Sequence, residues 1–450
     1  MVPNNFHLSD RSTPPSRRQL LAALGVGTAG ALAGCGSLTG SGAETLGQTA
    51  KFVPDDGDED DSFGESVALS ADGRTAVVGA DRDEDNGRWA GSAYVFTAAT
   101  DGWTQQAKLV PDDGGPDERF GYSVAISGDG TTVIVGIGDE EGPGAAGPSH
   151  EIAYVFEATD GGWTQRAKLA PYDDSHDTNV DGTPVALAAD GRTALLGHPW
   201  ARTADGDPVG AVTVVERTDE TWTPTTTLSV NDPQQSFSFG ESVALSADGT
   251  TAVIGDSDAL VDADKTSGSA HVFTRTGDRW QQEARLRPET GADLFGDAVS
   301  LSADGSTALV GAPLGGDNLR DFGPGWAYVF HDTDGWARGH KLVASDGNVG
   351  HETDRFGDAV ALADDGTTAV VGAVHDSHPN GRAAGSAYVF RAGADGWTQQ
   401  AKLAADDGEP HDFFGNSVAV SGDGSTVLVG AEDAAAPDGL RTGAVYAFSP

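Results

Sequence analysis

Cysteine and methionine are almost absent from this sequence, with one residue of each among 450. A chain with a single cysteine cannot form an intramolecular disulfide, so the stability of its folded part has to come from packing. The sequence also contains no Asn-x-Ser/Thr triplet. N-linked glycosylation is therefore not expected.

Basic residues are scarce as well. The chain has 27 lysines and arginines against 69 acidic residues, which gives a formal net charge of −42, and only 6 of the basic residues are lysine. Nucleic acids and anionic lipid surfaces require basic patches on their partners, so we expect neither as a direct partner. Mutual repulsion between copies favours a soluble monomer. The acidic, lysine-poor composition resembles that of proteins from salt-loving archaea, and it predicts a fold that needs high salt.

No apolar run of the sequence favours a membrane-spanning helix. Residues 20–33 form a short, glycine-rich apolar run, which is typical of an export signal. The preceding Arg17-Arg18 pair resembles the twin-arginine export motif, and Leu32-Ala33-Gly34-Cys35 resembles a lipobox. These resemblances imply a signal peptide over residues 1–34, a lipid on Cys35 and a flexible tether over residues 35–45. The expected location is the outer side of the cell membrane, with the lipid as the only membrane contact.

The rest of the chain is built from internal repeats. A glycine, in most copies preceded by phenylalanine, returns every 56 to 61 residues and marks seven copies. In the third copy Asp181 replaces the phenylalanine and Pro184 enters the first strand. The column consists of Gly64, Gly121, Gly182, Gly240, Gly296, Gly357 and Gly415.

Each copy reads as four short strands. In the first copy they are expected at residues 66–70, 75–80, 93–96 and 103–109. An Asp-Gly pair such as Asp72-Gly73 separates the first two strands and predicts a tight hairpin with positive φ at the glycine. Four antiparallel strands repeated at a fixed period predict an all-β fold, a seven-bladed β-propeller over residues 46–450.

The fourth strand predicts how the ring closes. Six copies contain a tryptophan followed five residues later by a basic residue or threonine, as in Trp103 and Lys108, but the last copy ends without a fourth strand. Residues 46–52, Leu-Gly-Gln-Thr-Ala-Lys-Phe, match the pattern Trp-Thr-Gln-Gln-Ala-Lys-Leu. We therefore expect this N-terminal segment to pair beside residues 444–448 as the outer strand of the last blade.

The repeated motifs resemble a known family. Phe-Gly at the first strand, together with Val78-Gly79-Ala80 and its equivalents at the second, is similar to the FG-GAP repeat. This family includes the seven-bladed heads of integrin alpha chains, so the resemblance implies an extracellular propeller used for binding. Integrins often hold calcium between the first two strands, but residues 71–74 are too few to supply about six to eight ligand oxygens. We therefore predict no cofactor, and no calcium at those positions.

Propeller topology places the connections between strands two and three, and between blades, on one rim. These connections vary in length and composition, and function tends to lie on variable loops held by a rigid scaffold. Three tryptophans outside the repeated column, Trp89, Trp200 and Trp326, are predicted to lie exposed in or near these loops. They are the candidate anchors for an extracellular protein or glycan.

Other chemistry has weaker support. The run Asp81-x-Asp83-x-Asp85 resembles a calcium loop but lacks the distal glutamate. Histidines on the same rim could only form a zinc site if three or four of them converged; they are His351, His375, His378 and His411. No nucleophile or phosphate-loop motif occurs, so we predict a non-catalytic binding or scaffolding protein and no metal site. The alternative is an exported enzyme acting on polysaccharide.

Overall fold

The computed structural model describes residues 46–100, 102–138, 153–170, 182–202, 209–230, 236, 238–262, 265–288, 294–316, 323–337, 339–347, 353–377 and 379–450. The predicted signal peptide, export motif and tether lie outside these residues, as do Arg17, Arg18 and Cys35. Among the described residues no helix is long and apolar enough to cross a membrane.

Seven four-stranded antiparallel sheets make up the fold, as the repeats predict. Blades 1 to 3 are β2 (Phe63–Leu69), β3 (Thr75–Ala80), β4 (Ser92–Ala99), β5 (Gly102–Leu109); β6 (Phe120–Ile126), β7 (Thr132–Ile137), β8 (Ala153–Thr159), β9 (Gly162–Leu169); and β10 (Val185–Leu187), β11 (Thr193–His198), β12 (Ala211–Thr218), β13 (Thr221–Leu228).

Blades 4 to 7 continue the ring, and blade 4 carries an additional small hairpin of β16 (Leu260–Asp262) and β17 (Lys265–Thr266). The blades are β14 (Val243–Leu245), β15 (Thr251–Asp256), β18 (Ser269–Thr276), β19 (Arg279–Leu286); β20 (Val299–Leu301), β21 (Thr307–Ala312), β22 (Trp326–His331), the short helix η2 (Asp332–Asp334), β23 (His340–Leu342); β24 (Phe356–Leu362), β25 (Thr368–Ala373), β26 (Ser386–Gly393), β27 (Gly396–Leu403); and β28 (Val418–Val420), β29 (Val427–Ala431), β30 (Ala444–Ser449), β1 (Gly47–Phe52).

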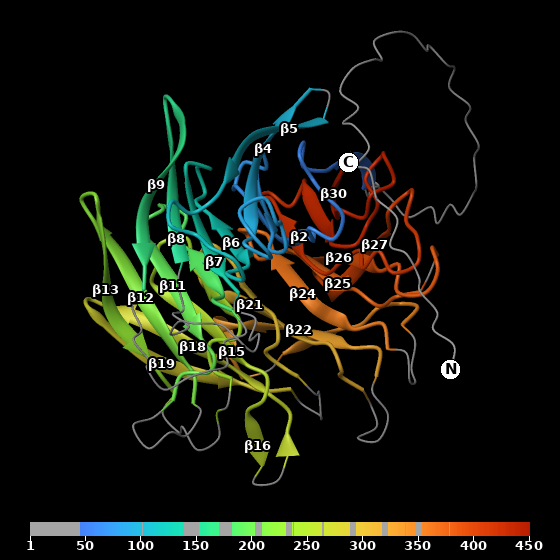
Figure 1. The fold of residues 1–450 in the computed structure, drawn as a ribbon. Helices are drawn as coiled ribbons and strands as arrows, with labels where there is room; N and C mark the ends of the chain where they lie inside the picture. Colours follow the sequence, from blue (N-terminus) through green and yellow to red (C-terminus); the bar gives the residue numbers. More distant parts are fainter. Residues whose placement is uncertain are drawn as a thin grey trace, which may run out of the picture. The chain divides into compact units, whose positions relative to one another are not determined.

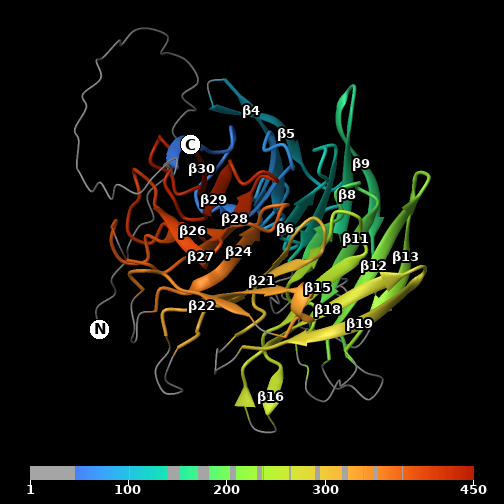
Figure 2. The same cartoon turned by 180° about the vertical axis from the view of Figure 1, so that it is seen from behind.

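The N-terminal strand closes the ring. β1 pairs antiparallel with β30, Lys51 opposite Tyr446 and Phe52 opposite Val445, and it is the outer strand of blade 7. Thr49 is an extra, unpaired residue between Gln48 and Ala50, and Gln106 of β5 is the equivalent extra residue in the outer pair of blade 1. The red blade 7 and the blue blade 1 therefore lie side by side in Figures 1 and 2, and the predicted closure is confirmed.

Backbone hydrogen bonds join the seven inner hairpins into a continuous circle. In each blade, the second residue after the end of the first strand donates its backbone N–H to the carbonyl of the equivalent residue in the next blade, at 2.9 to 3.1 Å. The degenerate third copy takes part as well. The circle runs through Ala71, Gly128, Ala189, Ala247, Ala303, Asp364, Gly422 and back to Ala71.

The two glycines of the repeat motif allow neighbouring blades to approach closely. Gly121 has φ +100°, which a side chain would strain. A Cβ on Gly79 would lie 1.9 Å from the Gly121 carbonyl oxygen, so no larger residue fits there. Phe-Gly and Val-Gly-Ala therefore recur because the second strand of one blade packs directly on the first strand of the next.

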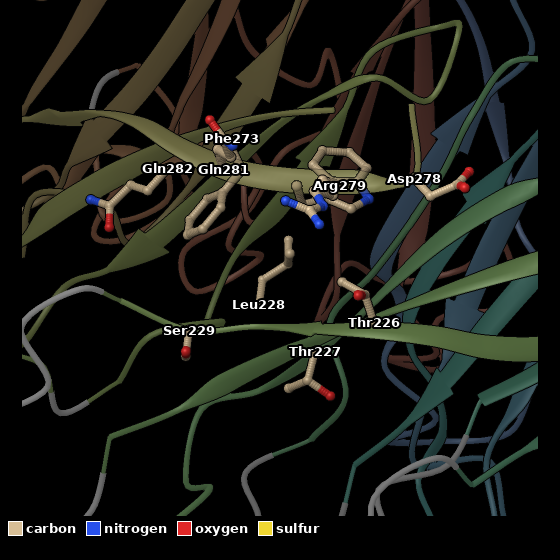
Figure 3. A pocket seen from close by; sticks show the side chains of 10 residues that line it. Thr226, Thr227, Leu228, Ser229, Phe273, Asp278, Arg279, Gln281 and Gln282 are labelled. Atoms are coloured by element: carbon tan, nitrogen blue, oxygen red, sulfur yellow. The ribbon is translucent and has the colours of Figure 1, made fainter. Parts of the chain in front are cut away.

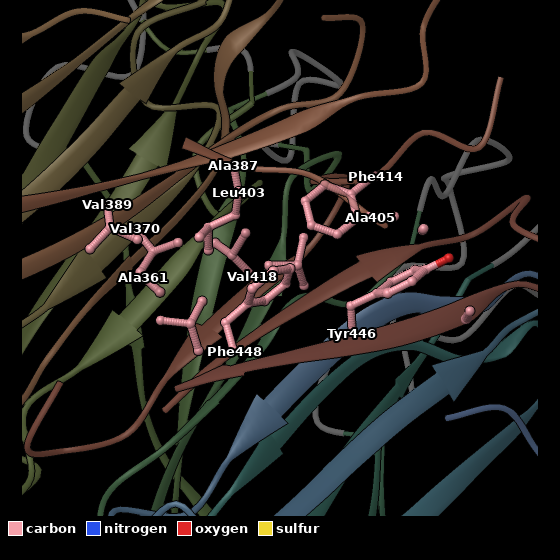
Figure 4. Packing of buried hydrophobic residues seen from close by; sticks show 14 of the residues in the cluster. Ala361, Val370, Ala387, Val389, Leu403, Ala405, Phe414, Val418, Tyr446 and Phe448 are labelled. Atoms are coloured by element: carbon pink, nitrogen blue, oxygen red, sulfur yellow. The ribbon is translucent and has the colours of Figure 1, made fainter. Parts of the chain in front are cut away.

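Aromatic side chains fill the space between blades. Phe414 lies edge-on to Tyr446 and Phe448, with ring centroids 5.4 and 5.9 Å apart. Figure 4 shows this cluster, in which Leu403 and Val389 of blade 6 pack towards blade 7. The same edge-on pairing of the Phe-Gly phenylalanine with two third-strand aromatics recurs in blades 1, 2, 5 and 6.

Strand boundaries differ from the sequence predictions in three places. β2 starts at Phe63 rather than at residue 66, because the Phe-Gly pair itself bridges to β3 ahead of a bulge. The Asp-Gly hairpin has four loop residues rather than two, with Gly73 at φ +70° and its N–H bonded to the Ser70 carbonyl. In blade 5 the short helix η2 displaces Trp336, and the fourth strand β23 begins only at His340.

Candidate functional site

The two kinds of long loop pair with each other on one rim. In blade 1 the N–H groups of Asp117 and Arg119, in the connection to blade 2, donate to the carbonyls of Arg88 and Trp89, in the loop between strands two and three. Equivalent bonds in blade 6 run from His411 and Phe413 to Arg382 and Ala383. We call the surface formed by these loops the loop rim.

A lysine ammonium occupies the centre of the calcium-like loop of blade 1. Lys108 Nζ lies 2.6 Å from Asp83 Oδ2, 2.7 Å from Asp85 Oδ2 and 3.0 Å from Asp56 Oδ2. The Tyr94 hydroxyl donates to Asp83 Oδ2 at 2.8 Å, and Asp81 pairs with Arg119 at 2.5 Å. Burial alone would lower the pKa of Lys108, but the bonds to its three carboxylates outweigh burial and raise it.

The same network of lysine, aspartate and tyrosine recurs around the ring. Lys51 pairs with Asp407, which also accepts a bond from the Tyr446 hydroxyl at 3.0 Å. Blade 6 joins Lys402 to Asp346 and Asp376, and blade 2 joins Lys168 to Asp113. The column of lysines is visible in the sequence, but the aspartates that pair with them were not predicted. The signal available was a tyrosine at a fixed place in the third strand, as in Tyr94, Tyr154, Tyr328, Tyr388 and Tyr446.

A second group of carboxyls lies near the starts of the first strands and just after the ends of the second strands. Burial raises the pKa of Glu65 well above its usual range, and the charges of Glu432 and Asp81 and a hydrogen bond with Glu432 raise it further. The raised pKa favours the protonated form of the Glu65 carboxyl. Burial likewise raises the pKa values of Asp81, Glu241, Asp297 and Asp358. We call this group the inner carboxyl cluster; it consists of Glu65, Glu432, Asp81, Glu241, Asp297 and Asp358.

The three candidate tryptophans are in different environments. Trp89 is half-buried on the loop rim, and the Arg88 guanidinium lies 4.7 Å from its ring centroid. Trp200 is half-buried in the turn that follows β11. Trp326 was expected to be exposed, but it is only 3% exposed at the start of β22, with Lys341 Nζ 3.4 Å from its ring. It is not available as a surface anchor in this structure.

The histidines do not converge on a metal site within the described part of the chain. His375 and His411 each pack against Phe413, with ring centroids 5.9 and 6.1 Å from it, while His351 and His378 fall outside the described residues. Among the residues described, no group of three or more His, Cys, Asp or Glu side chains has the geometry to hold a metal ion.

The closed ring of seven four-stranded sheets, with its paired loops on one rim, defines a seven-bladed β-propeller. A family model described as the FG-GAP repeat matches residues 46–96, 103–156, 222–273, 280–330, 336–390 and 397–448. These segments cover more than half of the chain, so the protein belongs to the FG-GAP repeat family, whose propellers are typical of binding and adhesion scaffolds on extracellular or surface proteins. Residues 157–221, which contain the first three strands of the degenerate third copy, are unmatched. A search of curated proteins found no match.

Proposed function

We propose that this protein is a non-catalytic binding propeller on the cell surface, and that its loop rim engages an extracellular protein or glycan. The observation that carries this proposal is the placement of Trp89. Its indole is half-buried, so part of the ring is exposed on the loop rim. The backbone φ of +47° recurs at the equivalent Ala383 of blade 6, so it belongs to the loop and not to the tryptophan.

Comparison with blade 6 supports a role for the Trp89 side chain in binding rather than in loop conformation. Ala383 occupies the equivalent position, has φ +50°, and accepts the same backbone bond from the following connection. The loop therefore takes this conformation without an indole. At Trp89 the indole is held against Arg88, which pairs with Asp117 at 2.7 Å. Tryptophan and arginine are the residues in which interface energy concentrates.

An exchange of loops tests which face binds. Residues 81–91 of blade 1 can be replaced by residues 374–385 of blade 6, which pair with the following connection in the same way. This exchange is expected to abolish partner binding with the fold retained. The control exchanges the inner hairpin residues 71–74 for residues 128–131 of blade 2, and should leave binding intact. Binding lost only in the control would put the site on the opposite face.

The membrane anchor is part of the proposal and has its own test. Replacing Arg17 and Arg18 by lysine is expected to trap precursor inside the cell. Cys35→Ser is expected to prevent lipid attachment, while the protein is still exported. Mass spectrometry of mature protein with an unmodified Cys35 would remove the anchor. A single acyl chain holds only marginally, so stable attachment requires a second chain or another contact.

A second candidate function, an exported enzyme acting on polysaccharide, is favoured by the inner carboxyl cluster. A protonated Glu65 carboxyl could act as a general acid. However, Glu65 and Glu432 are joined by a direct hydrogen bond, a distance much shorter than the ~5 Å or more that separates the two carboxyls of a glycosidase. Release of reducing ends from starch, cellulose, mannan or chitin, lost in Glu65→Gln, would support the enzyme. No release by the wild type would reject it.

A further inference from the structure

A cavity of about 490 Å³ lies between β13, the outer strand of blade 3, and β19, the outer strand of blade 4. Figure 3 shows Leu228 and Arg279 near its middle, Asp278 towards one end, and Phe273 and Gln282 towards the other. Its volume falls within the range of about 300–1,000 Å³ that small-molecule sites occupy. This cavity is away from the loop pairs of blades 1 and 6 that define the loop rim.

The sequence at this junction departs from the repeat. The fourth-strand position four residues after the tryptophan is alanine in most copies, and at four junctions this alanine and the next blade's tryptophan join one apolar cluster. In blade 3 this position is Thr226, and it faces the cavity together with Trp280 of blade 4. A larger side chain with a hydroxyl therefore replaces the alanine methyl group in the cavity wall that includes the indole. The alanines are Ala50, Ala107, Ala167, Ala284 and Ala401.

The walls of the cavity favour a ligand with many hydroxyl groups. Trp280 is half-buried, so part of its indole borders the open space. Thr226 and Ser229 supply hydroxyls, and Gln281 and Gln282 supply amides that can donate and accept. His271 Nδ1 lies 2.9 Å from Gln282 Nε2 and holds that amide in place.

The charges on the walls balance. Among the described residues that line the cavity, Asp278 and Arg279 are the charged ones, and they carry opposite signs. An anionic ligand would in addition meet the repulsion of a protein with a formal net charge of −42. The polar walls disfavour a purely apolar ligand, since it would desolvate these groups without bonding them. The partly positive C–H face of a sugar ring suits the negative face of an indole.

From this geometry we propose that the cavity between blades 3 and 4 binds a neutral oligosaccharide, with a sugar ring against Trp280 and its hydroxyls bonded by Thr226 and the glutamines. This deepens the proposed binding function by adding a glycan site on a surface other than the loop rim. It shares with that function only the premise that the protein binds without catalysis. A negative result with the Trp89 variants would therefore leave the cavity proposal standing, and the reverse also holds.

The test is calorimetric titration of the full mature chain in 2 M KCl with four neutral hexaoses, namely maltohexaose, cellohexaose, mannohexaose and N-acetylchitohexaose. Hexagalacturonate is the anionic comparator. The variants are Thr226→Ala, which restores the alanine of the repeat with little risk to folding, and Trp280→Ala. The matched control is Trp397→Ala, at the equivalent position of blade 6.

We expect at least one neutral hexaose to bind the wild type and the Trp397→Ala control, and hexagalacturonate not to bind. Thr226→Ala and Trp280→Ala should each weaken binding tenfold or more, with circular dichroism unchanged for Thr226→Ala. The proposal is overturned if none of the neutral hexaoses binds at 5 mM, or if Thr226→Ala binds as the wild type does. It is also overturned if hexagalacturonate binds as tightly as the neutral sugars.

Discussion

At the scale of single residues, the rim carboxylates that could have formed a cation cage are bound to the protein's own cations. Asp83 is buried, and its oxygens are taken by Lys108, Tyr94 and the Asp85 N–H. A lysine five residues after the repeated tryptophan thus supplies the counter-charge in this loop. The same reading applies to Lys51, whose partner Asp407 lies far away in the sequence.

Removing the lysine should therefore destabilise blade 1 strongly. Lys108→Met leaves Asp83 buried without a cation, and breaking such a pair costs about 3–5 kcal/mol. The matched variant Lys168→Met leaves Asp113 without its cation, but the Asp113 side chain is already 55% exposed to solvent. The loss of stability should therefore be well under half as large. Urea unfolding of both variants measures the difference. Equal losses would show that the buried carboxylate is not what the lysine stabilises.

Asp61 makes the stability of the fold fall as the pH rises, the opposite of the effect of Asp83, whose pKa is lowered. Burial raises the pKa of this carboxyl from 3.8 to about 7, against the lowering effect of the bond that it accepts from the Asp58 N–H. The folded state therefore holds a proton that the unfolded state has lost. The contribution of this group to the free energy of unfolding is complete below about pH 4. It is lost as the pH rises to about 7, by up to about 1.4 kcal/mol per pH unit.

Asp61→Asn is expected to remove this contribution. The free energy of unfolding of the variant should be flatter than that of the wild type between pH 4 and pH 7, and higher at about pH 8, in denaturant titrations at fixed salt. Asp61 is only 3% exposed, so solvent does not screen the carboxyl enough to cancel this pH dependence. Parallel pH profiles of the two proteins would contradict the assignment.

At the scale of elements, β1 decides whether the ring is closed. Phe52 of β1 is 6% exposed and stacks on Trp103 of blade 1 at 5.3 Å, so this strand contacts both the last blade and the first. Deleting residues 46–53 would leave β30 with a bare edge and expose apolar surface. At about 25 cal/mol per Å² the loss should reach several kcal/mol. An unchanged melting temperature would mean that the ring does not depend on this strand.

Period and pattern predicted the elements well, because strand alternation, Asp-Gly turns and close-packed glycines are local signals. The match of residues 46–52 to the fourth strand was enough to predict the closure. The carboxyl networks were not predictable in the same way. Their partners, such as Lys51 and Asp407, come together only when the ring closes, and an aspartate that pairs looks the same in the sequence as one that does not. The exposure predicted for Trp326 was wrong, and its contact with Lys341 forms only when β23 pairs with β22.

At the scale of the whole molecule, the net negative charge is the main influence on how stability depends on salt. A formal net charge of −42 opposes compaction by self-repulsion. The screening length falls from about 10 Å at 0.1 M salt to about 3 Å at 1 M, so molar salt should relieve most of the repulsion between exposed loops. The partly buried pairs of Lys108 are screened much less. The melting temperature by circular dichroism should therefore rise from 0.1 to 3 M KCl, and a flat or falling curve would contradict this view.

The membership in the FG-GAP family fits a scaffold whose circle of backbone bonds is uniform and whose loops differ. The degenerate third copy keeps its place in that circle through Ala189, although its Phe-Gly phenylalanine is lost. Blade sequence can therefore diverge while the frame remains. Trp89 and the cavity beside Trp280 both lie where one copy departs from the others.

The most direct test of the central claim is the affinity of the loop rim for its partner. A partner captured from a cell-surface extract would be titrated against the wild type, Trp89→Ala and Trp397→Ala in parallel, with melting temperatures recorded. The account predicts that Trp89→Ala binds about 30-fold more weakly, a loss of about 2 kcal/mol, with the fold unchanged, because Ala383 shows that this loop forms without the indole. Equal affinity of Trp89→Ala and the wild type would contradict it.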